Sequence, residues 1–423
     1  DHHMAHREST LILLTNTYPL SRGEEFLENE IDHVGRAFDR VVVIPIQAGP
    51  DDAQTRVIPS NAEVMRIART TPRSLDRTLT TAKGLFLLPP TGVDWAETRR
   101  HPRLLISDAH FEGRAQTALD GILAKIPNLR LTPETHVTIY SFWLHLTART
   151  ATLLADQLRA QGVTVDRVVS RAHRYDLYPN IAPRNHIPER RLLLQSLDEI
   201  CPVSEQGTRE LQTTWPQFAD KIETRYLGTA DPGPTAQCWR SPFTIVSCAH
   251  LSAVKRMTRM PAILARVRAT GIDARWTHLG DGPEMDALRQ EVAAHGVKEA
   301  VTLLGHVDNT QVMATQRDLK PSVFINLSAS EGLPVSMMEV ASLGIPIVAT
   351  DVGGVGEIVS SDNGHLLPAE FTDAQASDAL VQLAHLSDDE YSQVCQASRQ
   401  VWEDRFRASV VYPEFCREVL GGR

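Results

Sequence analysis

The feature that most limits the fold of this chain is a regular alternation of short apolar runs with segments of helical pattern. In the first half, runs rich in Val, Ile and Leu occur at 9–16, 39–46, 135–142 and 166–173. Helical patterns lie between them, including 24–38 and 146–162. Strands that alternate with helices are typical of a parallel sheet covered by helices, so the first half predicts a doubly wound α/β domain.

A second series of apolar runs follows a segment rich in proline and small polar residues. That segment, 231–242, suits a linker because proline disfavours the interior of helices and strands. We therefore expect domains at 4–230 and 243–400, each built like a Rossmann domain. The strand-like runs of the second domain are 243–250, 274–282, 300–306, 321–328 and 346–354.

Composition agrees with two globular domains and excludes several classes of protein. A chain of 423 residues exceeds the ~250 to 300 at which one core stops growing. Apolar residues make up 42% and charged residues 22%, and no apolar run is long enough to cross a bilayer. The net charge of -9 argues against a broad nucleic-acid-binding face, because such a face needs an excess of Lys and Arg.

Cysteine usage and the start of the chain bear on the compartment. The five cysteines are widely spaced and include no C-x-x-C pair, so neither a disulfide framework nor a zinc site is indicated. Asp1-His2-His3 before Met4 resembles a tag remnant, and no basic start with an apolar run follows. We expect a cytoplasmic protein, with a position at the inner face of a membrane left open.

The segment 66–116 breaks the alternation and mixes arginine with leucine. This pattern is typical of any surface helix, so a solvated helical insertion is the plain interpretation, and helices on the acceptor side are the alternative.

The sharpest motif is the apolar run 321–328 followed by a short turn and a helical pattern that starts near Pro334. Proline is favoured in the first turn of a helix, where its missing N–H costs nothing. The free N–H groups and the positive end of the helix dipole bind phosphate well, with no metal required. Gly332 would let a ligand approach closely, and Glu331 and Glu339 place one carboxylate before the helix and one inside it.

This segment resembles the retaining GT-B glycosyltransferases of family four. Their motif is Glu, seven residues and Glu, then G-x-P-[IV]-[IV]-A-[TS] and two glycines. Here Glu331 and Glu339 are followed by 344–350 (GIPIVAT) and the glycine pair at 353–354. The resemblance implies two Rossmann-like sheets, with Glu331 on the donor hexose and Glu339 on the ribose. The phosphates would meet the N–H groups near Leu333, Pro334, Val335 and Ser336.

The same family grips the diphosphate with a cation pair that follows a strand. In SCAHLSAVKR, Lys255 takes the lysine position and Arg256 stands beside it. His250 stands where the family usually has arginine, and a neutral imidazole supplies one donor where arginine supplies a fork. We therefore expect phosphate neutralisation to depend mainly on Lys255 and the helix N-terminus.

Two glycine turns follow predicted strands at the edge where open α/β sheets bind ligands. The first turn, 279–283, contains Gly280, and the second spans 303–309. In similar enzymes the main chain after the second glycine contacts the base. The resemblance therefore points to His306 and Val307 as nucleobase neighbours, with plain tight turns as the alternative.

In the first domain, 170–178 (SRAHRYDLY) ends a predicted strand with three polar side chains. By the resemblance, His173 is the active-site candidate, and a core or capping role for it stays open. Arg171 and Asp176 lie close to it in sequence and are expected on the acceptor side, where Asp176 could either orient the imidazole or accept from acceptor hydroxyls. The loop 16–30 resembles the Y-P-x-x-x-G-E-x-F opening of polysaccharide-building members, which places Gly23 towards the donor. Trp143 would either pack or stack on a sugar.

Together these motifs predict a metal-independent retaining transferase without a cofactor. It would move a hexose or N-acetylhexosamine from a nucleotide-diphosphate sugar, UDP favoured and GDP second, to a glycan, lipid-linked or small-molecule acceptor. Nucleic acid is not an expected partner, and peripheral membrane contact is left open. Segment 401–423 resembles the helix that crosses back to the first domain and lets closure bring His173 towards Glu331. The alternatives are a sugar-nucleotide 2-epimerase and a non-catalytic sugar-nucleotide-binding subunit.

Overall fold

The computed structural model describes residues 8–68 and 74–423, and these residues form two compact units. One unit holds the chain up to Tyr226 together with Ser409–Arg423, and the other holds Leu227–Ala408. In its described residues, each unit contains a six-stranded sheet whose neighbouring strands all pair in parallel. This confirms the predicted class of two Rossmann-like, doubly wound sheets.

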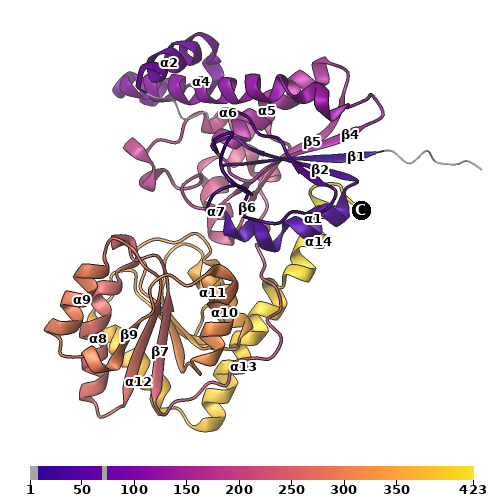
Figure 1. Ribbon diagram of the computed structural model, residues 1–423. Helices are drawn as coiled ribbons and strands as arrows, with labels where there is room; N and C mark the ends of the chain where they lie inside the picture. The colour runs from indigo at the N-terminus through magenta and orange to yellow at the C-terminus, as the bar shows by residue number, and fades with distance from the viewer. Residues whose placement is uncertain (1–7, 69–73) are drawn as a thin grey trace, which may run out of the picture. The chain divides into compact units, whose positions relative to one another are not determined.

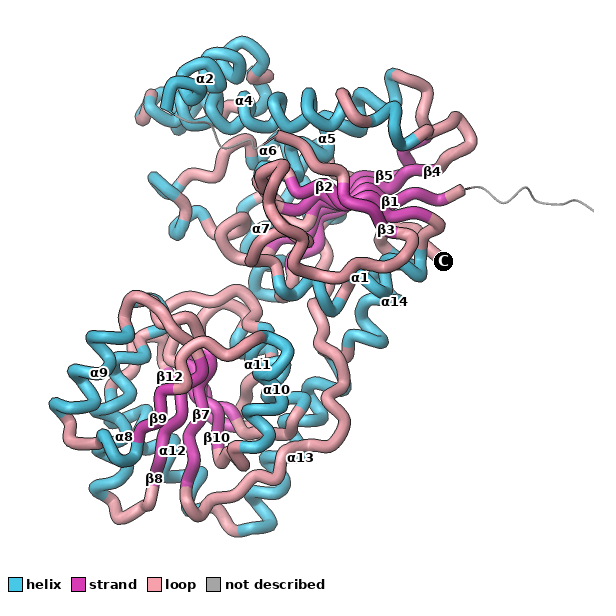
Figure 2. The backbone as a smooth tube through the Cα atoms, viewed as in Figure 1, coloured by secondary structure: helices cyan, strands magenta, loops and turns pink. Residues whose placement is uncertain are grey.

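The sheet of the first unit has the order β3-β2-β1-β4-β5-β6. Helices cover both of its faces (Figures 1 and 2). Its strands are β1 (Ser9–Thr15), β2 (Arg40–Pro45), β3 (Ala62–Val64), β4 (His136–Ser141), β5 (Thr164–Ala172) and β6 (Glu199–Pro202). Its helices are α1 (Ile31–Ala37), α2 (Ser74–Leu87), α3 (Trp95–Arg100), α4 (Arg103–Leu123), α5 (Leu146–Ala160), α6 (Arg190–Ser196), α7 (Glu205–Thr214) and α14 (Ala408–Glu418).

Both sides of β1 are buried, which explains why its apolar run is uninterrupted. Ile12 and Leu14 join a core with α4 and α5, whereas Leu11 and Leu13 join a second core with α1 and α14. A strand covered on both faces needs apolar residues at every position. The expected helix at 24–38 is instead a 3-10 turn, Glu25–Asn29, followed by α1.

The sheet of the second unit has the order β12-β11-β10-β7-β8-β9. Figure 1 shows its helices on both faces as well. Its strands are β7 (Phe243–Cys248), β8 (Ala274–Leu279), β9 (Val301–Leu303), β10 (Val323–Asn326), β11 (Ile347–Thr350) and β12 (Gly364–Leu367). Its helices are α8 (Met260–Ala269), α9 (Met285–Ala294), α10 (Asn309–Asp318), α11 (Val335–Ser342), α12 (Asp373–His385) and α13 (Asp388–Arg405).

The unit boundaries differ from the expected ones, because the second unit spans Leu227–Ala408 where 243–400 was expected. The expected linker 231–242 lies within the second unit, where Ala236 N donates to Leu343 O and Arg317 donates to Pro232 O. The expected crossover helix 401–423 consists of the end of α13 and the separate helix α14, and only Ser409–Arg423 belongs to the first unit. Segment 66–116 holds α2, α3 and the start of α4, with 69–73 outside the described residues.

Candidate active site

The loop between β10 and α11 carries Glu331 in a fixed position. Its Oε1 accepts from Ser328 Oγ (2.6 Å) and from Asn326 Nδ2 (3.3 Å). Asn326 ends the strand, and its Oδ1 accepts from Ser328 N at 2.9 Å. Strand end and loop therefore form one hydrogen-bonded unit that holds a largely buried carboxylate.

Lys255 reaches the same carboxylate from the loop that follows β7. Its Nζ lies 2.5 Å from Glu331 Oε1, and the lysine side chain stays 24% exposed. The two loops are joined by a main-chain bond from Ala329 N to Val254 O (2.8 Å). Two sequence-predicted residues, 76 positions apart, are thus brought into contact.

Helix α11 opens directly after this pair, and Pro334 is its N-cap rather than a residue of its first turn. The first intrahelical donors are Met337 N and Met338 N, which both bond to Pro334 O. The N–H groups of Val335 and Ser336 precede that ladder, as at any helix N-terminus. An anion beside Lys255 would therefore meet both an ammonium and the positive end of a helix.

Gly353 makes this loop arrangement sterically feasible. Its φ is +55°, and a Cβ there would lie 2.0 Å from Glu331 O. Gly354 N also donates to Gly332 O at 2.8 Å. The glycine pair after β11 therefore packs its main chain directly on the Glu331 loop and fixes it from one side.

Glu339 lies inside α11, near Cys248 at the end of β7. Burial raises the pKa of Glu339 to about 7, and its charge contributes to raising the pKa of the Cys248 thiol, which burial raises most. A carboxyl that titrates near neutrality can accept from or donate to a hydroxyl. This is compatible with the ribose contact expected for it.

Arg256 is engaged in a different way from the phosphate contact expected for it. Its guanidinium donates to the carbonyl oxygens of Leu327 (2.7 Å), Ser328 (3.0 Å) and Ala369 (2.9 Å). It also lies over the Phe371 ring, 5.0 Å from the centroid. The planar guanidinium of arginine can donate to several acceptors at once. Here two of the acceptors are main-chain carbonyl oxygens at the start of the Glu331 loop. The side chain therefore positions that loop.

The remaining candidates of the second unit lie at strand-end turns. His250 is exposed, and Gly280 packs so closely that a Cβ would lie 1.9 Å from Ala249 O. Gly280 N donates to Gly305 O (2.8 Å), which joins the two glycine turns predicted to frame the base. His306 is exposed and Val307 is half-buried beside that junction.

In the first unit, His173 lies in an aromatic cage at the end of β5. Its ring centroid is 4.4 Å from that of Trp143, 4.7 Å from Phe142 and 5.8 Å from Phe26. It is 7% exposed, and its Nδ1 lies 3.7 Å from Asp176 Oδ2, although neither ring nitrogen makes a hydrogen bond among the described residues. A buried imidazole without a hydrogen bond is unusual, because unsatisfied polar groups cost free energy. The ring is therefore available to a ligand.

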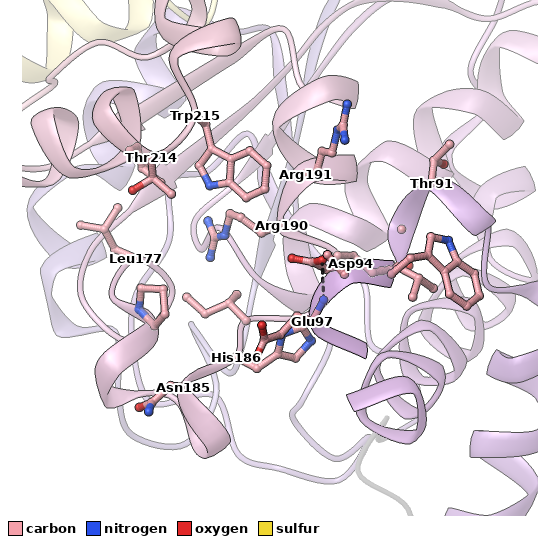
Figure 3. A pocket seen from close by; sticks show the side chains of 18 of the residues that line it. Thr91, Asp94, Glu97, Leu177, Asn185, His186, Arg190, Arg191, Thr214 and Trp215 are labelled. Carbon is pink, nitrogen blue, oxygen red and sulfur yellow. Dashed lines mark hydrogen bonds between the residues drawn. The ribbon is translucent and has the colours of Figure 1, made fainter. Parts of the chain in front are cut away.

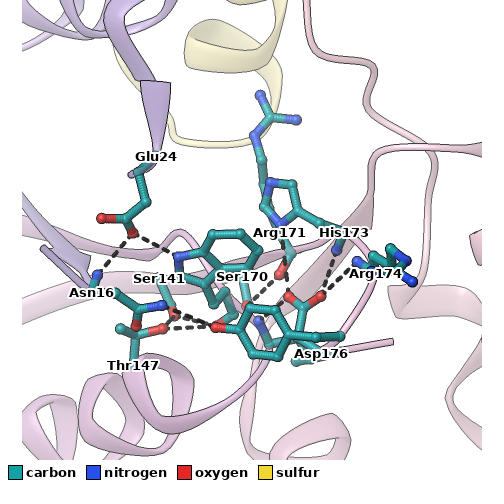
Figure 4. Close-up of polar contacts among 12 residues, drawn as sticks. Asn16, Glu24, Ser141, Thr147, Ser170, Arg171, His173, Arg174 and Asp176 are labelled. Carbon is teal, nitrogen blue, oxygen red and sulfur yellow. Dashed lines mark hydrogen bonds and ion pairs between the residues drawn. The ribbon is translucent and has the colours of Figure 1, made fainter. Parts of the chain in front are cut away.

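Asp176 holds the main chain around that histidine (Figure 4). Its two oxygens accept from the N–H groups of His173 (2.8 Å), Arg174 (3.0 Å) and Leu144 (2.8 Å). Burial alone would raise the pKa of Asp176, but the contacts with His173 and these N–H groups hold it below its usual value. The acceptor-side role expected for Asp176 does not match a fully buried carboxylate that is already bonded.

Arg171 likewise faces the core, not an acceptor. It is 0% exposed and donates to Tyr140 Oη (2.7 Å) and Arg225 O (2.7 Å), with Glu30 Oε1 at 3.4 Å. Arg171 and His173 point to the same side of the sheet by alternation, but Arg171 lies within β5 whereas His173 follows its last residue. Proximity in sequence therefore did not place both side chains in the site.

The loop after β1 is held by Glu24, which the sequence analysis did not single out. Its carboxylate accepts from the N–H groups of Asn16 (2.8 Å), Thr17 (2.8 Å) and Tyr18 (2.7 Å). It also accepts from Trp143 Nε1 (2.6 Å), so Trp143 packs in the cage instead of being free to stack on a sugar. Gly23, next to Glu24, is half-buried with φ +99°.

The positioning residues that sequence reasoning missed share one property. Asn326, Ser328, Gly353 and Glu24 all act on neighbouring main chain or on Glu331, and such roles leave only short local signals. The glycine pair and the G-E dipeptide were visible in the motifs. Their physical task became clear only from the contacts.

Two properties concern the described part of the chain as a whole. Among residues 8–68 and 74–423, no cluster of three or more His, Cys, Asp or Glu side chains could hold a metal ion. No helix in these residues is long and apolar enough to cross a membrane.

Two six-stranded, Rossmann-like parallel sheets match the GT-B fold of glycosyltransferases, and solved structures share this fold. Anabaena HepE in complex with UDP and glucose aligns with a TM-score of 0.62 and 16% identity, covering 97% of this chain and 99% of its own. Sucrose-phosphate synthase from Thermosynechococcus elongatus gives a TM-score of 0.67 and 13% identity over 97% and 98%. At these sequence identities, the structural similarity shows a shared fold and nothing further.

The family is defined by the second unit. Residues 242–385 match the family described as Glycosyl transferases group 1, and this match supports a glycosyltransferase. A relative from Escherichia coli strain K12, named colanic acid biosynthesis glycosyltransferase WcaL, is 28% identical over 63% of this chain and 67% of its own length. The GtfA subunit of the UDP-N-acetylglucosamine–peptide N-acetylglucosaminyltransferase of Streptococcus gordonii is 25% identical over 53% and 45%. The chain thus spans from under half to about two thirds of these relatives.

Proposed function

We propose that this chain is a retaining glycosyltransferase that uses a nucleotide-diphosphate sugar, with UDP as the favoured nucleotide. The transferred group would be a hexose or N-acetylhexosamine, and the acceptor a hydroxyl of a glycan, a lipid-linked glycan or a small molecule. A growing polysaccharide or lipid-linked glycan is the favoured acceptor. The reaction would need no metal or other cofactor.

The single observation that carries this proposal is the contact of Lys255 Nζ with Glu331 Oε1, 2.5 Å apart, at the N-terminus of α11. The pair offers a cation and a helix terminus to a diphosphate and a carboxylate to sugar hydroxyls. Charge-assisted bonds of both kinds give orientation as well as affinity.

Relatives support the choice of nucleotide and acceptor class. The HepE structure contains UDP and glucose, and a pneumococcal O-GlcNAc transferase GtfA structure, with a TM-score of 0.54, contains UDP and GlcNAc. The WcaL relative is named for colanic acid biosynthesis. These names describe the relatives, and they favour UDP-sugars and polysaccharide acceptors as the first substrates to test.

The proposed reaction is a front-face substitution. The bond from the anomeric carbon to the diphosphate oxygen breaks, and the acceptor oxygen bonds to the same face of the sugar. The acceptor proton passes to the departing diphosphate oxygen, whose charge Lys255 and the α11 N-terminus stabilise. Preorganised charges of this kind supply most of the rate enhancement in many enzymes.

Three groups take supporting roles in the proposal. Glu339 would bond the ribose, and the turns at Gly280 and His306 would border the base. His173, whose Nε2 makes no hydrogen bond among the described residues, would contribute a hydrogen bond to a sugar hydroxyl from the first unit. His250 would add at most one donor to the phosphates, so Lys255 carries most of that interaction.

The test is a coupled transfer assay with purified protein, EDTA and a panel of UDP- and GDP-sugars. We expect nucleotide diphosphate release that depends on an added glycan or lipid-linked acceptor, with a product that keeps the donor's anomeric configuration. A 2-epimerase would instead interconvert the sugar nucleotide without acceptor-dependent release. A protein that only binds the donor would change none of these signals, and either result would overturn the proposal.

A further inference from the structure

The first unit contains a pocket that the transfer reaction, as proposed, does not use. It has a volume of about 520 Å³ and lies between the segments 91–97, 177–191 and 210–215 (Figure 3). Val93, Leu177, Ile187, Leu211 and Trp215 give it largely apolar walls. Concave apolar pockets with a few polar groups are the usual form of small-molecule sites.

One polar group in its lining is a buried arginine. Arg190 is 9% exposed, and Figure 3 shows its side chain among the labelled lining residues, near Trp215 and Arg191. Its Nη2 donates to the carbonyl oxygens of Asp176 and of Leu144 (3.3 Å), while Nη1 has no hydrogen-bond partner among the described residues. No ion pair of Arg190 occurs in the described part of the chain.

A buried guanidinium with an unsatisfied N–H group is energetically costly. Burial lowers the pKa of Arg190 to about 10, although the charge of Asp176 acts to raise it. The neighbouring Glu189 adds little negative charge. Burial and nearby Glu112 raise the pKa of Glu189 to about 10, so it is a neutral acid at pH 7.

The carboxylates at the rim of the pocket have other partners. Asp94 caps α3 through Glu97 N (3.1 Å), and Glu97 lies 3.6 Å from Arg100 and 3.4 Å from His101. An adjoining hollow of about 710 Å³ shares Glu97, Asn185 and His186 with the pocket. It is lined by the cations Arg100, Arg103 and Arg184, which would attract an anion towards the mouth.

We propose that this pocket binds a small molecule that joins an anionic group, a carboxylate or a phosphate, to an apolar body. The anion is bound by Arg190, and the apolar body packs on Leu177, Leu211 and Trp215. The pocket is formed by residues of the first unit, whereas Lys255 and Glu331 belong to the second, and binding in the pocket does not depend on transfer activity.

Titration calorimetry of the full chain with matched probes tests the proposal. The probes are 4-phenylbutyrate, its neutral analogue 4-phenylbutan-1-ol, 4-phenylbutyl phosphate and acetate. We expect saturable binding of at least one phenylbutyl anion, about tenfold or more tighter than the alcohol and than acetate. The two anions distinguish carboxylate from phosphate as the preferred group. Equal affinity for anion and alcohol, or no binding of any probe, would overturn the proposal.

Variants locate the binding in the pocket. Arg190→Gln should remove the tenfold preference for the anion, whereas the matched change Arg209→Gln, at an exposed position on α7 outside the pocket lining, should keep it. Because Arg190 also bonds two main-chain carbonyls, Thr214→Trp provides a second variant that fills the exposed rim. Wild-type anion binding by a folded Arg190→Gln or by Thr214→Trp protein would contradict the proposed site.

Discussion

At the scale of single residues, the Glu331 carboxylate is held in place by its neighbours before any substrate binds. Its Oε1 accepts from Lys255, Ser328 and Asn326, so its orientation is set in the absence of any substrate. Lys255 keeps a quarter of its side-chain surface exposed, which leaves room for a second anion. A ligand diphosphate can therefore share the ammonium without rearrangement of the loop.

The Lys255–Glu331 pair makes a direct prediction for catalysis. We expect Lys255→Ala and Glu331→Gln each to lower kcat for transfer by about 100-fold or more, because each removes a charge that acts on the departing or transferred group. The circular dichroism spectrum and Tm should stay close to wild type. Lys298→Ala, a change at an exposed lysine of the same unit, is the control and should keep full activity. Near-wild-type turnover by both pair variants would show that the pair is not catalytic.

Glu339 makes a prediction for stability against pH. Its pKa is raised by burial from 4.5 to about 7, so the fold binds this proton more tightly than the unfolded chain. The stabilisation is complete below about pH 4.5 and is lost as pH rises through about 7. Glu339→Gln keeps the neutral form, so it should stabilise the protein at pH 8 relative to wild type, by up to about 3 kcal/mol, and do little at pH 4.5. Chemical unfolding at both pH values measures this, and an equal effect at both would refute it.

At the scale of elements, strand-end loops determine where the candidate side chains lie. The loops after β7, β10 and β11 are joined by Ala329 N to Val254 O and by Gly354 N to Gly332 O. Arg256 adds bonds to the carbonyl oxygens of Leu327 and Ser328. This network explains why α11 begins where it does.

Gly353 gives the sharpest test of that network. Gly353→Ala would place a Cβ 2.0 Å from Glu331 O at a φ of +55°, so we expect a loss of about 2 to 4 kcal/mol of unfolding free energy and weaker donor binding. Gly356→Ala is the matched control, because the added Cβ would lie 3.4 Å from its nearest neighbour, Asp351 Oδ1. Denaturant unfolding should separate the two variants. Equal stability of both would contradict the close approach described here.

The alternation of apolar runs was sufficient to predict the two sheets, because strands buried on both faces are apolar at every position. The short strands β3, β6 and β12 were not expected, since runs of three or four residues carry little periodicity. Within the site, Lys255 and Glu331 were predicted by motif, and their contact agrees with a shared role. The acceptor-side interpretation of Arg171 and Asp176 did not anticipate their burial, because sequence proximity gives no depth within a strand or loop, whereas packing was one of the two roles expected for Trp143.

At the scale of the whole molecule, the chain returns to its first unit at the C-terminus. Phe415, Cys416, Val419 and Leu420 are buried in the core that includes Leu11, Leu13 and Val43. The sequence resemblance suggested a returning helix, and α14 with the residues after it belongs to that unit. The stability of the first unit therefore depends on the last residues of the chain.

Removal of residues 409–423 should destabilise the first unit selectively. Loss of four buried side chains, each worth about 1.5 to 3 kcal/mol, exceeds the stability of many domains. Scanning calorimetry should show loss of one unfolding transition, while the transition of Leu227–Ala408 persists, since its main core contains none of these residues. Removal of Arg423 alone, which breaks an exposed pair with Asp39, should change little. An intact first-unit transition after the longer deletion would contradict this assignment.

The central claim is that Lys255, Glu331 and the N-terminus of α11 form a nucleotide-diphosphate site. Titration calorimetry of the full chain with UDP and with GDP, in buffer containing EDTA, tests it most directly. We predict saturable one-to-one binding of at least one nucleotide without metal, weakened about tenfold or more by Lys255→Ala and unchanged by Lys298→Ala. Absence of binding by both nucleotides, or equal affinity of the Lys255→Ala and wild-type proteins, would contradict the account.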